Sequence, residues 1–329
     1  MRTISAEIKS YRTLKPFVIA RGQKTSAEQI EVTIREGAHC GRGACVPYKR
    51  YGETLDSVMS EITDIKQALA AGLDRDELQE KMPAGAARNA VDCALWDLES
   101  AQTGKSVCEL ADLLSPAPKV TAITVSVGTP NEVLSAARAV ATAPLIKLKL
   151  GGDGADNQRF DAALRGAPNS KFILDGNEAL TIEQLDSLLA QGPIEKIALI
   201  EQPFAADHDD PLDSHAHHNI LCADESFHTI ETIDTVAKRY GVINIKLDKT
   251  GGLTEAIAIQ RHAKQHGLKT MIGCMLGSSL AMAPAFLLAA DAHWIDLDGP
   301  LLLAEDDEPA FQYENYAMHP SPLWGAGKK

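Results

Sequence analysis

The chain has 329 residues, of which 45% are hydrophobic and 23% charged, and its formal net charge at pH 7 is −13. This length allows a large core plus a second, smaller domain. A strongly negative chain with no long basic run would repel a phosphate backbone or an anionic membrane surface, so we expect no nucleic acid partner and no membrane partner.

The N-terminal stretch MRTISAEIKSYRTL lacks the apolar core of a signal peptide. Residues 280–290 form the most apolar later stretch, but it is short and contains Pro284, so it does not fit a membrane span. We therefore expect a cytoplasmic protein. Its six cysteines include no CxxC pair, a pattern typical of free thiols rather than of disulfides or a zinc site.

The first part of the chain, residues 1–115, predicts an α+β capping domain. Two strand-like segments are followed by two helix-like segments, at residues 3–14, 31–35, 55–71 and 85–102. The last of these segments carries Trp96, which we expect in the core of this domain rather than against a ligand.

Residues 116–300 predict a catalytic domain with a (β/α)8-type barrel. Short apolar or β-branched runs alternate with helix-like polar segments, and successive runs end 23 to 27 residues apart. The eight runs are 123–127, 145–150, 172–175, 197–201, 220–224, 242–247, 270–274 and 293–297. Eight strands at this near-constant spacing are typical of a (β/α)8-type barrel. The C-terminal segment 301–329 has no clear period, and its return to the cap is left open.

The charged residues of these strands fall at the strand ends, where the chemistry of such barrels takes place. They are Lys147 and Lys149 on the second strand, Asp175 on the third, Glu201 on the fourth, Asp224 on the fifth, Lys246 on the sixth, and Asp296 and Asp298 at the eighth. We expect these side chains to converge on one mouth.

Three of the acids, Asp175, Glu201 and Asp224, come from adjacent strands with no histidine or cysteine beside them. Such an oxygen-only set suits a hard dication, and Mg2+ is the cofactor that we expect. The alternative is that the acids only pair with the lysines. We favour the metal, because clustered acids are costly without a cation.

Lys147 and Lys149 share one face of their strand, about 6.5–7 Å apart. A neighbouring ammonium, a dication and partial burial all favour a neutral lysine, so we expect Lys147 to lower the pKa of Lys149. Lys246 would face Lys149 across the mouth. One lysine would remove a proton α to a carboxylate and the other would return one to the opposite face, while the metal and Lys147 stabilise the enolate oxygens. The alternative is that these lysines only snorkel from the strand ends.

Together these motifs resemble the enolase superfamily, in its muconate-lactonizing subgroup, and within it the dipeptide epimerases. The resemblance covers nearly the whole chain, and its motifs are specific as a set. They are Lys147-Leu-Lys149, Asp175-Gly-Asn177, Glu201-Gln-Pro203, Ala223-Asp-Glu-Ser226, Asn244 to Gly252 (NIKLDKTGG) and Asp296-Leu-Asp-Gly-Pro300, with Pro16 to Gly22 and Pro83 to Asn89 in the cap. Gly176 departs from the pattern, since relatives commonly have Ala there.

The resemblance implies a modified (β/α)7β barrel and an isomerase that interconverts L-Ala-D-Glu and L-Ala-L-Glu or similar dipeptides, with a role in recycling peptidoglycan peptides. It also implies a role for each site residue. The metal ligands are Asp175, Glu201 and Asp224; the acid/base pair is Lys149 and Lys246; the substrate-binding residues are Lys147, Thr124, Arg21, Asn177, Met275, Asp296 and Asp298. Arg21 would pair with a glutamyl carboxylate, and Asp298 with the α-ammonium. Whether the chain forms a homo-oligomer is left open.

Three other functions are compatible with parts of this pattern. The same machinery could carry out cycloisomerisation or dehydration of a carboxylate, of the muconate or o-succinylbenzoate type, although Asp298 favours a substrate with an ammonium group. A Schiff-base lyase would use one barrel lysine as nucleophile, which the three acids do not suit. A non-enzymatic binding or scaffold barrel would leave the converging lysines and acids unused.

Two further patterns are set aside. The stretch His208 to His218 is rich in imidazoles and carboxylates, but it connects two predicted strands and is typical of a solvated loop. The glycine-rich stretches at 151–154 and 325–329 lack the spacing of a phosphate-binding loop, so we expect no nucleotide.

Overall fold

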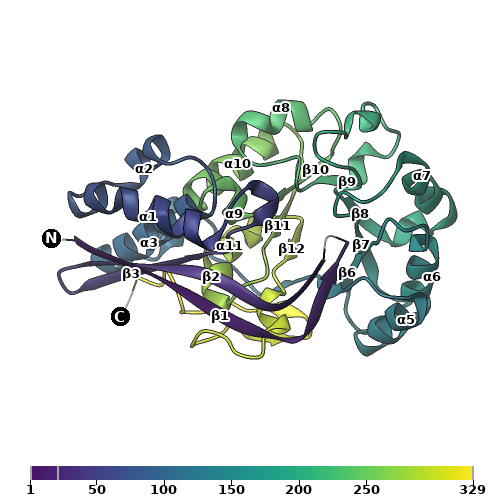
Figure 1. Cartoon of the computed structure of the whole chain (residues 1–329), viewed down its shortest axis with the longest axis horizontal. Helices are drawn as coiled ribbons and strands as arrows, with labels where there is room; N and C mark the ends of the chain where they lie inside the picture. Colours follow the sequence, from purple (N-terminus) through teal and green to yellow (C-terminus); the bar gives the residue numbers. More distant parts are fainter. Residues whose placement is uncertain (1, 21, 328–329) are drawn as a thin grey trace.

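The computed structural model of the chain describes residues 2–20 and 22–327 (Figure 1). Its N-terminal part is a three-stranded antiparallel sheet in the order β1-β2-β3, covered by helices. The elements are β1 (Arg2–Ile19), β2 (Gly22–Glu36), β3 (His39–Cys45), the 3-10 turn η1 (Lys49–Tyr51), α1 (Leu55–Ala70), α2 (Arg75–Lys81), α3 (Ala86–Thr103) and α4 (Val107–Ala111). The predicted strands and helices of the cap lie within or on these elements, whereas β3, α2 and α4 have no counterpart in the prediction.

Helix α3 packs directly on the backbone of β3, because two glycines of that strand leave no side chain in the way. A Cβ atom at Gly41 or Gly43 would lie 2.2 Å from the carbonyl oxygen of Ala94 or Ala90, respectively. Most of α3 is buried as a result, including Trp96, which is 4% exposed. Trp96 is buried as expected, but it belongs to the core cluster that continues into the barrel and not to the cluster of the cap alone.

The second part is a sheet of eight parallel strands in sequence order, and it confirms the predicted barrel class. Its strands are β5 (Ile123–Val125), β6 (Leu145–Lys149), β7 (Lys171–Asp175), β8 (Ile197–Glu201), β9 (Leu221–Ala223), β10 (Val242–Ile245), β11 (Lys269–Gly273) and β12 (Trp294–Asp296). A parallel bridge between Thr121 and Ile295 joins the last strand to the segment before the first. Each predicted strand overlaps one of these eight.

Helices lie between the barrel strands, and several begin at sequence-encoded caps. They are α5 (Pro130–Ala139), α6 (Asp156–Gly166), α7 (Ile182–Gln191), α8 (Ile233–Val236), α9 (Leu247–Thr250), α10 (Leu253–Gln265) and α11 (Ser279–Phe286). Thr129 with Glu132 and Thr181 with Gln184 form capping boxes at α5 and α7. The short 3-10 turns are η2 (Ile194–Lys196), η3 (Asp210–Leu212), η4 (His218–Ile220), η5 (Ile230–Thr232), η6 (Ala289–Asp291) and η7 (Gly299–Leu302).

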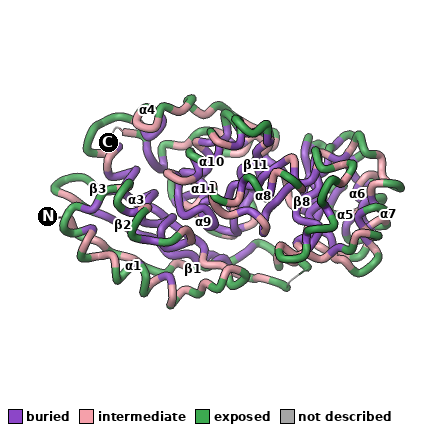
Figure 2. Tube along the Cα trace, turned by 90° about the horizontal axis from the view of Figure 1, so that it is seen from above, coloured by how far each residue is buried: buried purple, intermediate pink, exposed green. Residues whose placement is uncertain are grey.

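Side chains alternate between two faces along β6, and this alternation decides what fills the interior there. On β6, Ile146 and Leu148 belong to the main core between strands and helices, while Leu145 belongs to a separate apolar cluster formed by inward residues of neighbouring strands. Lys147 and Lys149 therefore follow Leu145 on the inward face. The interior has an apolar floor with charged residues above it, and buried residues run through the middle of the molecule (Figure 2).

Helix α3 also ties the cap to the barrel segment that follows β10. Arg88 donates to the carbonyl oxygens of Thr250 and Gly251 at 2.8 and 3.1 Å. Asn89 Nδ2 donates to Asp248 Oδ1 at 2.8 Å. The indole of Trp96 donates to Thr254 Oγ1 at 3.0 Å, so one helix holds this segment at several points.

The C-terminal segment runs back along both parts of the molecule. A third sheet pairs β4 (Lys119–Val120) with β14 (Ala317–Met318), which pairs with β13 (Tyr313–Glu314). Farther along, Trp324 Nε1 donates to the carbonyl oxygen of Arg42 at 2.6 Å. The division of the chain at residues 115 and 300 stays a prediction. Among residues 2–20 and 22–327, no helix is both long and apolar enough to cross a membrane.

Asp92 on α3 allows a test of the cap–barrel contact through pH. Burial raises its pKa to about 6, although hydrogen bonds from the Thr254 backbone N–H and hydroxyl lower it. Because the folded pKa exceeds the unfolded value of about 3.9, the folded state binds more protons between these two values. The stabilisation is present at low pH and is lost as pH rises through 6.

We expect the Asp92 contribution to the free energy of unfolding to fall by about 1 kcal/mol between pH 5 and pH 7.5. Asp92→Asn should remove this part of the pH dependence, at the cost of one hydrogen bond at both pH values. Urea denaturation at the two pH values checks it. If the free energy of unfolding of Asp92→Asn changed between the two pH values as much as that of wild type, another group would be responsible for the pH dependence.

Candidate active site

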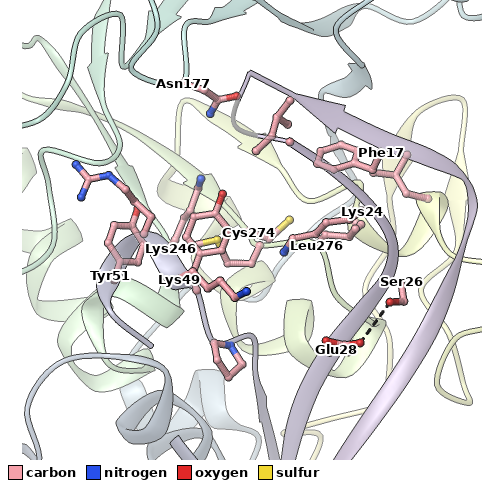
Figure 3. Close-up of a pocket in the computed structure, with 18 of the residues that line it drawn as sticks. Phe17, Lys24, Ser26, Glu28, Lys49, Tyr51, Asn177, Lys246, Cys274 and Leu276 are labelled. Atoms are coloured by element: carbon pink, nitrogen blue, oxygen red, sulfur yellow. Dashed lines mark hydrogen bonds between the residues drawn. The ribbon is translucent and has the colours of Figure 1, made fainter. Parts of the chain in front are cut away.

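A cavity of about 960 Å3 lies where the cap meets the C-terminal ends of the barrel strands. The end of the β1–β2 hairpin and the turn η1 line one side, and inward residues of the barrel line the other. Figure 3 shows Lys246 and Cys274 of the barrel between Tyr51 of η1 on one side and Phe17 and Lys24 of the β1–β2 hairpin on the other.

The structure brings the predicted residues together at this cavity. The predicted residues that line it are Thr124, Lys147, Lys149, Asn177, Asp224, Lys246, Met275, Asp296 and Asp298. Asp175 and Glu201 are fully buried and contact Lys147. Arg21 lies outside the described residues.

Each of the three strand-end carboxylates has one oxygen held by a donor of the surrounding fold. These bonds are Asn177 N–H to Asp175 Oδ1 at 2.9 Å, Asn244 Nδ2 to Glu201 Oε1 at 2.8 Å, and Lys249 Nζ to Asp224 Oδ1 at 2.7 Å. The second oxygen of each carboxylate is thereby turned towards the lysines of the mouth.

These second oxygens contact buried ammonium groups. Lys147 Nζ lies 3.0 Å from Asp175 Oδ2, 2.7 Å from Glu201 Oε2 and 2.7 Å from Asp296 Oδ2. Lys149 Nζ lies 2.6 Å from Asp175 Oδ2. Lys246 Nζ lies 2.6 Å from Asp224 Oδ2. Lysines and acids thus form one connected network at the centre of the mouth.

The acids of the network raise the proton affinity of two of its lysines. Burial would lower the pKa of Lys147, but Asp175, Asp296 and Glu201 raise it well above its usual value. In the same way Asp224 and Glu201 outweigh burial at Lys246 and raise its pKa. At these two lysines the attraction of the acids outweighs burial, while the effect of Lys147 that we expect on Lys149 stays a prediction.

The clustering of the acids has its clearest effect on the pKa of Glu201. Burial and the neighbouring Asp175 raise its pKa to about 7, with Asp224 adding to the effect and Lys147 opposing it. Carboxylates crowded in this way are stabilised by added positive charge.

The donor set fits a hard dication. Asp175, Glu201 and Asp224 offer only oxygen atoms, and Lys147 already places a cation in contact with two of them. The oxygens of the three residues do not all lie within 4.8 Å of one another, since lysine ammonium groups stand among them. Asp175, Glu201 and Asp224 would hold a Mg2+ ion, which would supply further positive charge to the crowded acids.

Two further acids lie at the eighth strand. Asp298 Oδ2 accepts a hydrogen bond from the Thr124 backbone N–H at 2.7 Å, and burial together with Asp296 raises the pKa of Asp298 to about 7. Asp296 Oδ1 is buried and has no hydrogen-bond partner among the described residues. This end of the cavity is suited to a positively charged or hydrogen-bond-donating group.

Lys149 and Lys246 lie on opposite sides of the mouth. Lys149 ends β6, Lys246 directly follows β10, and these strands are four places apart in a sheet of eight. Each is more than 90% buried and lines the cavity. A carbon atom between the two amines would have one on each face.

Sequence reasoning did not identify the residues that support this arrangement. Lys249 is buried and donates to Asp224 Oδ1, to the Asp224 carbonyl oxygen and to the Asn244 carbonyl oxygen. Gly273 on β11 leaves room for Asn244, because a Cβ atom there would lie 2.5 Å from Asn244 Oδ1. In the sequence, only the position of Lys249, three residues after Lys246 and beyond a strand end, indicates that it supports the site. Gly176 has a similar constraint, since its Cβ would lie 2.8 Å from Pro203 Cα.

The sequence matches two families along its length. Residues 3–112 match the "Mandelate racemase / muconate lactonizing enzyme, N-terminal domain", and residues 132–327 match "Enolase C-terminal domain-like". The L-Ala-D/L-Glu epimerase of Escherichia coli (strain K12) is 40% identical over 321 residues, which cover 97% of this chain and 100% of that protein. The N-acetyl-D-glutamate racemase of a Pseudoalteromonas species is 40% identical over 90% of this chain and 95% of that protein.

Solved structures show the same fold. An enolase family member from Agrobacterium tumefaciens, with bound sodium and L-Ala-L-Glu, has a TM-score of 0.96 and 43% identity, and the match covers 99% of this chain and 100% of that one. A dipeptide epimerase from Methylococcus capsulatus, complexed with Mg and the dipeptide L-Arg-D-Lys, has a TM-score of 0.87 and 28% identity, over 99% of this chain and 98% of that one.

Lys249 yields a prediction about stability. Lys249→Met would leave the Asp224 carboxylate without one of its two ammonium partners in a buried site, which should lower the free energy of unfolding by about 3 kcal/mol. Urea denaturation in EDTA measures this loss. Arg165→Met, which breaks an exposed ion pair with Asp161, is the matched control and should change stability by less than about 1 kcal/mol. If both variants lost less than about 1 kcal/mol of the free energy of unfolding, the Lys249 charge would not contribute to stability.

Proposed function

The chain belongs to the enolase superfamily, with the N-terminal domain of the mandelate racemase/muconate lactonizing enzymes, and from this premise we propose that it is a Mg2+-dependent epimerase of dipeptides such as L-Ala-D-Glu and L-Ala-L-Glu. The observation that carries the proposal is the pair of buried lysines on opposite sides of one cavity, Lys149 and Lys246. The named epimerase and racemase relatives, 40% identical over nearly the whole chain, support an isomerase.

Asp175, Glu201 and Asp224 would hold the Mg2+, as their oxygen-only chemistry suits. When bound, the ion supplies positive charge that offsets the crowded acids and the negative charge that develops on the substrate carboxylate. Magnesium is present in the dipeptide complex of the Methylococcus capsulatus structure, which supports this assignment.

The lysines would perform the proton transfer. The neutral lysine accepts the proton from the α-carbon and becomes an ammonium, and the charged lysine gives its proton to the opposite face of the same carbon. The two exchange roles when the other stereoisomer is the substrate. Lys147, held charged by its acids, would face the developing negative charge of the carboxylate.

The remaining cavity residues would select the substrate. Asp296 and Asp298 would receive the α-ammonium of the dipeptide, since Asp296 Oδ1 has no other hydrogen-bond partner among the described residues. Thr124, Asn177 and Met275 line the cavity and would contact the substrate. We propose that Arg21, from the cap, pairs with the glutamyl carboxylate.

Two alternatives use the same machinery. One is cycloisomerisation or dehydration of a carboxylate, which needs only one lysine as base. The other is racemisation of an N-acylated amino acid, as the name of the Pseudoalteromonas relative states for that protein. An N-acyl group brings no positive charge to Asp296 and Asp298, so these acids favour a dipeptide with a free ammonium.

The main test measures exchange of the α-proton for deuterium. In heavy water with Mg2+, Lys149→Ala and Lys246→Ala should each lower net epimerisation of L-Ala-L-Glu and L-Ala-D-Glu by at least about 100-fold. Each variant should keep slow exchange with one stereoisomer only, and the two should keep opposite isomers. Mass spectrometry reads the exchange, and a chiral separation reads the epimerisation.

Lys105→Ala, at an exposed position of the cap, is the control and should behave as wild type. Near wild-type epimerisation by Lys246→Ala would refute the two-lysine mechanism and favour a one-base cycloisomerase or dehydratase. Exchange with N-acetyl-D-glutamate in preference to both dipeptides would instead identify an N-acylamino acid racemase.

Asp224→Asn tests the metal assignment. The amide keeps the size of the side chain but loses its charge, so the Mg2+ concentration for half-maximal activity should rise at least about tenfold. Activity as a function of Mg2+ concentration measures this shift. Asp97→Asn removes a buried acid of the cap and should leave the half-maximal concentration unchanged. Wild-type turnover of Asp224→Asn at limiting Mg2+ would show that Asp224 is not a ligand.

A further inference from the structure

Two histidines and an acid meet on the outside of the barrel, away from the residues that line the cavity. His262 lies in the last turn of α10 and His266 caps that helix, four residues later, so both rings lie on one side of the helix. The ring centroids are 4.2 Å apart with an interplanar angle of 31°. Asp234 of α8 approaches them, with its Oδ1 3.5 Å from His266 Nε2.

The hydrogen bond of His266 determines which nitrogen is available. Its Nδ1 lies 3.0 Å from the carbonyl oxygen of His262, and because a carbonyl oxygen only accepts, Nδ1 must carry the proton. In the neutral ring the lone pair is then on Nε2, the atom that faces Asp234. A backbone carbonyl that orients a histidine in this way is the usual outer partner of a metal-bound imidazole.

We propose that Asp234, His262 and His266 form a second cation site, selective for an imidazole-binding transition metal such as Zn2+, Ni2+ or Cu2+ rather than for Mg2+. One ligand atom from each residue lies within 4.8 Å of the others, and within the described part of the chain no other group of three His, Cys, Asp or Glu residues meets this distance. Two histidines four residues apart on a helix are a known zinc-binding pattern. The negative end of the helix dipole adds to the attraction.

The ion would reach this site without any opening of the fold. The side chains of Asp234 and His266 are 84% and 36% exposed. Three protein ligands would leave a coordination position for water, as in zinc sites that are not fully enclosed. The protein carries a net charge of −13, which favours cation binding in general.

A second group of two histidines and an acid offers an internal comparison. His215 and His217 have ring centroids 6.0 Å apart, and His215 Nε2 lies 3.4 Å from Asp186 Oδ1. Here His215 Nδ1 accepts from the His217 backbone N–H, so Nε2 carries the proton and points it at the carboxylate. Both nitrogens are occupied, and this ring has no lone pair for a metal. Each group has two histidines and an acid, but we expect the group at His262 and His266 to bind a metal ion and the group at His215 and His217 not to bind one.

The position of the site would give a bound ion an effect on the barrel. Helix α8 lies between β9, which precedes Asp224, and β10, which precedes Lys246. Helix α10 follows the segment that carries Lys246 and Lys249. An ion shared by α8 and α10 would join two successive units of the barrel from outside and stabilise them by its binding energy.

Electron paramagnetic resonance of Cu2+ tests the site on the full chain. The described residues that line the cavity include lysine amines but no histidine, so the hyperfine coupling to the remote nitrogen of an imidazole ring distinguishes the outer site from the mouth. We expect this signal in wild type at one equivalent of Cu2+ with excess Mg2+ present, and its loss in the double variant His262→Asn/His266→Asn. Asp234→Asn should weaken Zn2+ binding, measured by competition with a chromophoric chelator, at least about tenfold.

The double variant His215→Asn/His217→Asn removes the same number of imidazoles and should keep the signal and the Zn2+ affinity. Zn2+ should raise the melting temperature of wild type and of this control, but not of the His262/His266 variant. Imidazole signal that survives loss of His262 and His266, or that disappears with His215 and His217, would overturn the proposal. Epimerase activity with Mg2+ should stay within about twofold in every variant, so failure of this site would leave the proposed function untouched.

Discussion

Buried charge that must be compensated is the constraint on which the mouth of this barrel depends. The charged residues within it at less than 9% exposure include Asp175, Glu201, Asp224, Asp296, Asp298, Lys147, Lys149, Lys246 and Lys249. Isolated, each would cost several kcal/mol to bury, so each is stable only beside its partners. The acids keep Lys147 and Lys246 charged, and the lysines keep Asp175 and Asp224 ionised despite their burial. The site is therefore one electrostatic unit, in which chemistry at any member changes the proton affinity of the others.

Much of the fold and the mouth could be predicted because both follow from local patterns. Regular apolar runs indicate barrel strands, and alternation along β6 requires Lys147 and Lys149 to share a face with Leu145. The strand β3 was missed because its sequence HCGRGAC has glycines where apolar side chains would mark a strand; those glycines exist for the contact with α3. The direction of the lysine pKa shifts needed distances, since attraction and burial oppose each other.

The supporting residues were harder to predict, because their partners come from distant parts of the chain. Lys249 is recognisable as functional only when its bond to Asp224, 25 residues earlier, is known. Helix α3 holds the segment after β10 from more than 150 residues away through Arg88, Asn89 and Trp96. The cap therefore does more than cover the cavity, because its central helix fixes the backbone from which Lys246 and Lys249 project.

Gly273 shows how a position without a functional group can be part of a functional site. Its backbone is ordinary strand, so the need for glycine there is steric and not conformational. The volume that a methyl group would fill is the volume in which Asn244 reaches Glu201. Enlarging this residue by one carbon would alter the orientation of a carboxylate three strands away on β8, although no charge or hydrogen-bonding atom had been changed. At this position the absence of a side chain is what the orientation of Glu201 requires.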